Sequence, residues 1–114
     1  MGGRKEQGLD DDVNKSREIN VTAAGLRSNR LYVPLNFFPV DAIGGGRKED
    51  AAEKLITVTF GDGSTVQTDI DGEKRTLRCR GAVSEFIVKA GLQEGDRVLI
   101  TRLSRYHYQF TKAS

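Results

Sequence analysis

Hydrophobic and polar residues follow regular spacings in several short stretches of this 114-residue chain, most clearly between Arg80 and Leu103. Four apolar residues in that stretch recur at helical spacing and predict a short amphipathic helix: Val83, Phe86, Ile87 and Ala90. Gly91 is well placed to end this helix in the left-handed conformation. Residues 97–103 then alternate as a strand. The pattern is typical of a helix that closes one end of a β-barrel.

Most other patterned stretches predict strands. Residues 54–60 and 64–70 have high strand propensity, and the sequence Gly61-Asp62-Gly63 between them is typical of a hairpin turn. Residues 75–80 and 106–110 also alternate. In the last segment Tyr106, Tyr108 and Phe110 would share the inner face. These segments predict a mainly β fold.

The first half of the chain has weaker signals. Residues 19–23 and 31–33 predict two short strands joined by a basic loop over residues 24–30. Asn36 can cap a helical turn that runs to Ala42. Residues 44–50 contain three consecutive glycines followed by charged residues, and they predict a flexible linker between elements.

Residues 1–18 form a polar segment that predicts a disordered N-terminal tail or linker, and residues 19–114 predict a single domain. No apolar run approaches the roughly 20 residues that span a bilayer. The N-terminus lacks the apolar core of a signal peptide. We therefore expect no membrane partner, and a cytoplasmic (bacterial) or otherwise intracellular protein.

Candidate catalytic and metal-binding groups are sparse. Cys79 and His107 are the only residues of their types, so neither an internal disulfide nor a zinc site is predicted. Cys79 is expected to face inward from a strand and His107 to lie at the surface. The chain has no Ser-His-Asp order and no paired carboxylates spaced to bind a divalent ion. The sequence predicts no catalytic residue, metal or cofactor in this chain.

The charge is weakly positive overall but clustered. The net charge is +2, from 18 basic and 16 acidic side chains. Two basic segments would lie at the same end of a barrel and form two arms around a groove. The first arm is Arg27, Ser28, Asn29 and Arg30, and the second is Glu73, Lys74, Arg75, Thr76 and Arg78.

The residue types in these arms suit double-stranded DNA. Arginine and lysine bind backbone phosphates, and this gives affinity. Arginine can also contact guanine, while Asn29 suits adenine and Glu73 could accept a hydrogen bond from cytosine. The arms therefore predict both phosphate and base contacts.

Three motifs occur in an order that resembles the DNA-binding pseudobarrel family. They are VTAAGLRSNRLYVPLNFF, VTFGDGSTVQTDID and RGAVSEFIVKAGLQEGDRVLI. The family includes plant B-three transcription factors and the recognition or effector domains of bacterial restriction endonucleases, of the EcoRII N-terminal type. The resemblance covers residues 19–110. A tryptophan usually accompanies the glycine matched by Gly81, and its absence here favours the bacterial branch.

The resemblance implies an open, seven-stranded pseudobarrel with two short helices at its ends. It also implies that the two arms grip the major groove, and that the chain is the recognition domain of a restriction endonuclease whose nuclease domain lies elsewhere in the parent protein. Two alternatives stay open. The Leu-x-x-Gly-Asp-x-Val turn at residues 92–98 also occurs in swapped-hairpin transcription regulators of bacteria, and a small barrel could instead bind protein or carbohydrate.

Overall fold

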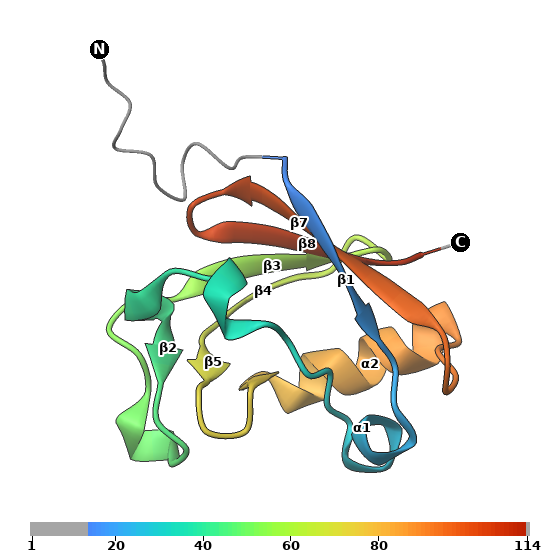
Figure 1. Ribbon diagram of the computed structural model, residues 1–114, viewed down its shortest axis with the longest axis horizontal. Coiled ribbons are helices and arrows are strands. Elements are labelled where there is room, and N and C mark those ends of the chain that lie inside the picture. Colours follow the sequence, from blue (N-terminus) through green and yellow to red (C-terminus); the bar gives the residue numbers. More distant parts are fainter. Residues whose placement is uncertain (1–13, 114) are drawn as a thin grey trace.

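The computed structural model describes residues 14–113, which form a mainly β fold with two α-helices (Figure 1). The predicted fold class is confirmed, and the strands form two mixed sheets rather than a closed barrel. The elements are β1 (Ser16–Asn20), α1 (Ala23–Ser28), β2 (Ile43–Gly44), β3 (Ile56–Phe60), β4 (Thr65–Thr68), β5 (Ile70–Asp71), β6 (Thr76–Leu77), α2 (Arg80–Ala90), β7 (Arg97–Ser104) and β8 (His107–Lys112), with 3-10 helices η2 (Leu35–Phe37), η3 (Val40–Ala42) and η4 (Lys48–Asp50).

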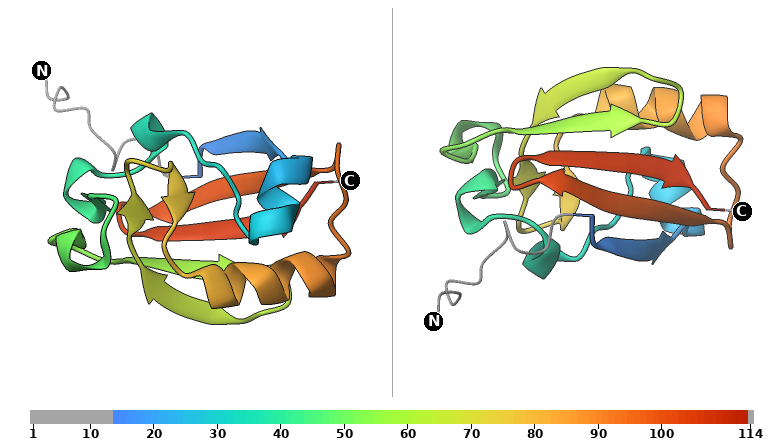
Figure 2. Two further views of the ribbon diagram at one scale, coloured as in Figure 1. Left: turned by 90° about the horizontal axis from the view of Figure 1, so that it is seen from below. Right: turned by 90° about the horizontal axis from the view of Figure 1, so that it is seen from above.

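The larger sheet has the strand order β1-β7-β8-β3-β4, and the smaller has the order β2-β5-β6. Strands β3 and β8 are parallel, as are β2 and β5, while the remaining neighbours are antiparallel. The two sheets are joined through the short step from β4 to β5 (Figure 2). The small sheet and α1 lie on the same side of the large sheet (Figure 1).

The core lies between the large sheet and α2. Alternating residues of the central strands are buried: Ile56, Val58 and Phe60 in β3, Val98 and Ile100 in β7, Tyr108 and Phe110 in β8. The sequence predicted this alternation in β7 and β8. Helix α2 buries Val83 and Phe86, and the Phe86 ring centroid lies 4.9 Å from that of Phe60. Gly91 ends the helix with φ 64° and ψ 41°, which confirms the predicted C-cap.

The predicted hairpin over residues 19–33 is wrong. Strand β1 pairs with β7, and it begins at Ser16, before the predicted start of the domain at residue 19. The segment predicted as a basic loop contains helix α1, which Thr22 caps by accepting a hydrogen bond from the Gly25 N–H at 3.0 Å. A good N-cap followed by two alanines favours a helix here. The predicted tail at residues 1–13 lies outside the described residues.

Other boundaries also differ. Residues 35–42 form two separate 3-10 helices, and Asn36 lies inside the first instead of capping a turn. The predicted strand over residues 75–80 is reduced to β6, because α2 already begins at Arg80. Cys79 therefore precedes the helix; it is half-buried, and burial raises the pKa of its thiol.

An arginine side chain lies inside the fold. Arg102 of β7 is 2% exposed and faces the core alongside Val98 and Ile100. Its Nη2 donates to the Phe37 carbonyl at 2.7 Å, and its guanidinium lies 4.2 Å from the centroid of the Phe37 ring. Hydrogen bonding and a cation–π contact offset part of the cost of burying the charge.

Neither described helix has the length and apolar character needed to cross a membrane.

Truncation of Phe86 tests the role of α2 in the core. Phe86→Ala should lower the free energy of unfolding by about 3–5 kcal/mol, because it leaves a cavity against Phe60. The matched control is Val88→Ala on the same helix, whose side chain is 76% exposed and which should change stability by no more than about 0.5 kcal/mol. Urea denaturation followed by circular dichroism measures both. Equal losses in the two variants would contradict this packing.

Candidate nucleic-acid interface

The two predicted arms lie on the same side of the molecule, the side that carries α1 and the small sheet (Figure 2, left). The chain leaves the first arm at Arg30 and runs directly along β6. There Tyr32 forms an isolated β-bridge with Thr76, and the Val33 N–H donates to the Arg75 carbonyl at 2.8 Å. Backbone pairing therefore fixes the spacing of the arms.

The first arm is the end of α1 and the residues that follow it. Asn29 is the C-cap in the left-handed conformation, with φ 56°, and the Arg30 N–H donates to the Gly25 carbonyl at 2.8 Å. The Ser28 hydroxyl donates to the Ala24 carbonyl at 2.7 Å. A Cβ at Gly25 would lie 2.6 Å from the Arg30 carbonyl oxygen, so only glycine fits there. These contacts hold the first arm in one conformation.

Asp71 fixes the backbone of the second arm through hydrogen bonds to its carboxylate. Its buried Oδ1 accepts the Glu73 and Lys74 N–H groups, each at 3.0 Å, and Arg75 then takes the left-handed conformation with φ 62°. Burial raises the pKa of Asp71, but hydrogen bonds from Lys74 and Glu73 and the charge of Lys74 outweigh that effect, so that the pKa is lowered overall. The ionised carboxylate therefore stabilises the turn.

Three arginine side chains of the arms are available to a ligand. Arg27 and Arg75 are exposed and Arg30 is half-buried. Within residues 14–113, no hydrogen bond or ion pair engages these guanidinium groups, whereas Arg80 donates to the Ser28 carbonyl at 2.9 Å. Unpaired guanidinium groups are suited to phosphate oxygens and to the edge of guanine.

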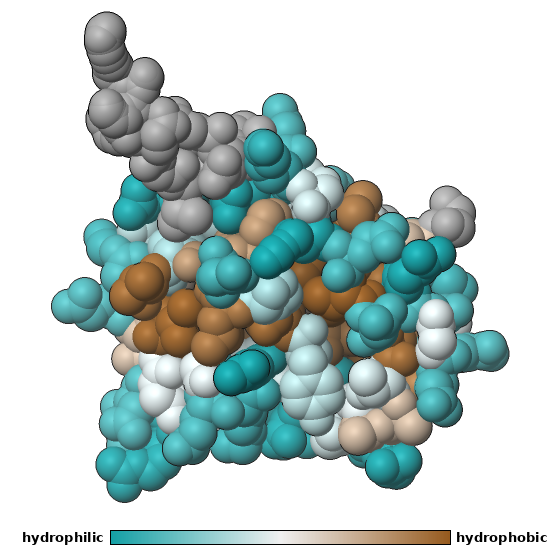
Figure 3. All heavy atoms as spheres, viewed as in Figure 1, coloured by the Kyte–Doolittle hydropathy of each residue, from teal (hydrophilic) through white to brown (hydrophobic). Residues whose placement is uncertain are grey.

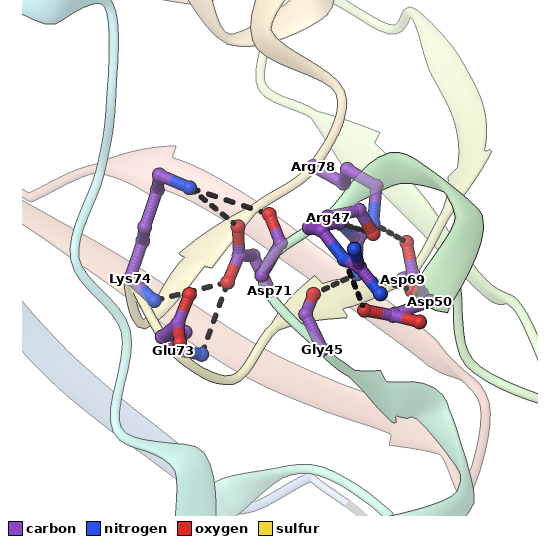
Figure 4. Close-up of polar contacts among 9 residues, drawn as sticks. Gly45, Arg47, Asp50, Asp69, Asp71, Glu73, Lys74 and Arg78 are labelled. Atoms are coloured by element: carbon purple, nitrogen blue, oxygen red, sulfur yellow. Dashed lines mark hydrogen bonds and ion pairs between the residues drawn. The ribbon is translucent and has the colours of Figure 1, made fainter.

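Two predicted contact residues have other roles in the structure. Thr76 is 2% exposed and faces the interior. Arg78 forms a bidentate pair with Asp69, with Nε–Oδ1 at 2.7 Å and Nη2–Oδ2 at 3.0 Å (Figure 4). The hydrogen bond to Asp69 raises the pKa of Arg78. Thr76 is thus inaccessible to DNA, and Arg78 is already engaged within the protein.

A groove of about 390 Å³ lies between the arms. Its lining includes four basic residues and one acidic residue: Arg30, Lys48, Lys74 and Arg78, with Asp71. Lys48 comes from the segment that the sequence predicted to be a linker, and Tyr32, which is 37% exposed, lies beside the arms; sequence reasoning missed both. In the sequence, only the basic pair Arg47-Lys48 after three glycines indicates that Lys48 could be part of a binding site.

Basic side chains outnumber acidic ones in the lining of this groove. Hydrophilic side chains cover the lower left of the face in Figure 3, over the segment that follows β2. Within the described residues, no group of three or more His, Cys, Asp or Glu side chains is placed to hold a metal ion.

No protein-family model matches the chain, and no curated protein matches it. Among solved structures, the N-terminal domain of Helicobacter pylori LlaJI.R1 is similar, with a TM-score of 0.56 and 12% sequence identity. The match covers 88% of this chain and 88% of that chain. At this identity the likeness concerns the fold alone. Membership of the pseudobarrel family stays a prediction.

Breaking the Arg78–Asp69 pair should destabilise the fold strongly. The Asp69 side chain is 4% exposed, so Arg78→Met leaves a buried carboxylate without its partner and should cost about 3–5 kcal/mol. The double variant Arg78→Met with Asp69→Asn should recover part of that loss, because no buried charge is left. Chemical denaturation of both variants measures this; an equal or greater loss in the double variant would contradict it.

The lowered pKa of Asp71 predicts a pH-dependent contribution to stability. A carboxylate whose pKa is lower in the folded state stabilises the fold above its unfolded pKa of about 3.9. The contribution is lost as the pH falls through the folded value. The stability difference between the wild type and Asp71→Asn should therefore be constant above about pH 5 and shrink below about pH 4. Denaturation at several pH values tests this, and a difference independent of pH would refute it.

Proposed function

We propose that this domain binds double-stranded DNA in a sequence-specific manner, with its two arms in the major groove. The observation that carries the proposal is the position of Arg27, Arg30 and Arg75. They come from two distant parts of the sequence, lie on the two arms, and form no hydrogen bond or ion pair through their side chains with the described residues. DNA offers both the phosphates that attract such cations and the guanine edges that pair with them.

The roles of the other arm residues follow from their surroundings. Asn29 is exposed at the tip of the first arm and can address adenine, and Glu73 is exposed on the second and can accept from cytosine. Lys74 lies 3.3 Å from the Gly46 carbonyl and 3.5 Å from Asp71, so it contributes positive potential to the groove. Ser28 and Thr76 act through the shape of the arms.

We further propose that the chain is the recognition domain of a restriction endonuclease. The resemblance of the three sequence motifs to recognition domains of restriction endonucleases supports this assignment, as does the fold likeness to the N-terminal domain of Helicobacter pylori LlaJI.R1. In that arrangement a nuclease domain of the same parent protein is the partner, and this domain supplies the DNA contacts.

Charge reversal in both arms tests the proposal. Arg30→Glu combined with Arg75→Glu should lower duplex affinity at least about tenfold, because each change replaces attraction to phosphate or guanine by repulsion. The matched control is Arg97→Glu, an exposed arginine at the start of β7. Fluorescence anisotropy with a duplex selected from a randomised pool measures the affinities.

Specific readout predicts that the pool yields one enriched short motif and that affinity falls as salt rises. Unchanged binding by the double variant would refute the role of the arms. Salt-independent binding to a neutral ligand, with no enriched duplex, would favour a protein- or carbohydrate-binding domain.

A further inference from the structure

Residues 47–50, between β2 and β3, include one basic side chain that forms no ion pair with the described residues. Residues 47–50 hold two basic and two acidic side chains. Arg47 pairs with both acids, at 3.2 Å from Asp50 and 3.9 Å from Glu49. Lys48 is exposed and has no ion pair or hydrogen bond through its side chain within residues 14–113. The four charges sum to zero, but Lys48 is the basic side chain of this segment that forms no ion pair with the described residues.

The fold brings Lys48 to the groove between the arms. It lines that groove together with Arg30 of the first arm and Lys74 of the second. The segment is anchored beside the second arm, because β2 runs parallel to β5 and the Gly72 N–H donates to the Gly44 carbonyl at 2.9 Å. Three separate parts of the chain therefore supply cations to one groove.

The Arg78–Asp69 pair fixes the segment at both ends. Beyond Asp69, the Arg78 guanidinium donates to the Gly45 carbonyl at 2.8 Å and the Arg47 carbonyl at 3.3 Å (Figure 4). Asp69 Oδ2 also accepts the Ala52 N–H at 2.7 Å. Each donor nitrogen of Arg78 thus has a protein partner. Arg78 holds the backbone before Lys48, and Asp69 holds the backbone after it.

The glycines make this closure of the segment possible. The Gly45 N–H donates to the Asp50 carbonyl at 2.8 Å, which closes the segment on itself. A Cβ at Gly44 would lie 2.5 Å from the Asp50 carbonyl oxygen and 2.7 Å from the Ala52 nitrogen. A larger residue would displace the backbone. The three-glycine run thus permits a compact conformation, in which Lys48 has a defined place.

We infer that Lys48 binds a DNA backbone phosphate, and that residues 45–50 are a third contact element beside the two arms. The inference rests on the proposed function. Lysine presents a point charge without the fork that arginine uses on guanine, so a phosphate is the better match than a base edge. Arg78 is a positioning residue that acts through this segment, and it does not itself contact DNA.

Salt dependence distinguishes a phosphate contact from other roles of Lys48. Each phosphate contact contributes about 0.9 to the slope of log K against log salt concentration. Lys48→Ala should reduce the slope by about 0.9, so that its loss of affinity is about threefold greater at 50 mM than at 200 mM salt. Lys48→Arg should keep the wild-type slope. The control Lys112→Ala, an exposed lysine at the end of β8, should also leave the slope unchanged.

The experiment uses the whole chain with a fixed duplex and with the randomised pool, followed by fluorescence anisotropy. A reduced slope in Lys48→Ala with the same enriched motif as the wild type supports the inference. Wild-type binding with an unaltered slope in Lys48→Ala overturns the inference alone. Failure of the wild type to bind any duplex overturns the proposed function and the inference with it.

The positioning role of Arg78 has its own test. The conservative variant Arg78→Lys keeps the positive charge. It loses the bidentate hydrogen bonds to Asp69 and the hydrogen bonds to the carbonyl groups of Gly45 and Arg47. If Arg78 acts through Lys48, Arg78→Lys should reduce the salt slope when Lys48 is present. It should cause no further reduction when combined with Lys48→Ala. Additive reductions in slope would show that Arg78 acts independently of Lys48 and would overturn its positioning role. Circular dichroism confirms that both variants are folded.

Discussion

The buried pair between Asp69 and Arg78 is the interaction on which the arrangement of the candidate site depends. Asp69 lies between β4 and β5, where the chain passes from the large sheet to the small one. With the carboxylate 4% exposed, its charge requires a partner, and Arg78 provides one through two hydrogen bonds of 2.7 and 3.0 Å. The remaining donors of Arg78 reach the segment after β2. One ion pair therefore joins both sheets and the groove.

Internal contacts already order the backbone of the candidate interface in the free protein. Caps at Thr22 and Asn29 fix the first arm, the Asp71 carboxylate fixes the second, and backbone pairing at Tyr32 sets the distance between them. The side chains that form these internal hydrogen bonds determine the conformation of the arms. The unpaired arginines lie on this ordered backbone, so the protein loses little backbone entropy when a ligand binds them.

Local patterns predicted the elements that rest on local rules. The strand at β3, the alternation in β7 and β8, the helical spacing of Val83 and Phe86 and the glycine C-cap at Gly91 all appear in the structure. The hairpin over residues 19–33 failed because β1 pairs with β7, a partner far along the chain that no local pattern reveals. Helix α1 was missed because its six residues give too short a periodic signal.

The sequence by itself determined a mainly β domain, its closing helix and two basic segments, because spacing and charge are properties of neighbouring residues. Only the tertiary structure decided which of the basic side chains are free. Arg78 looks equivalent to Arg75 in the sequence, yet one is bound to a buried carboxylate and the other is exposed. Lys48 belongs to a neutral segment, and its place in the groove follows from contacts with residues more than twenty positions away.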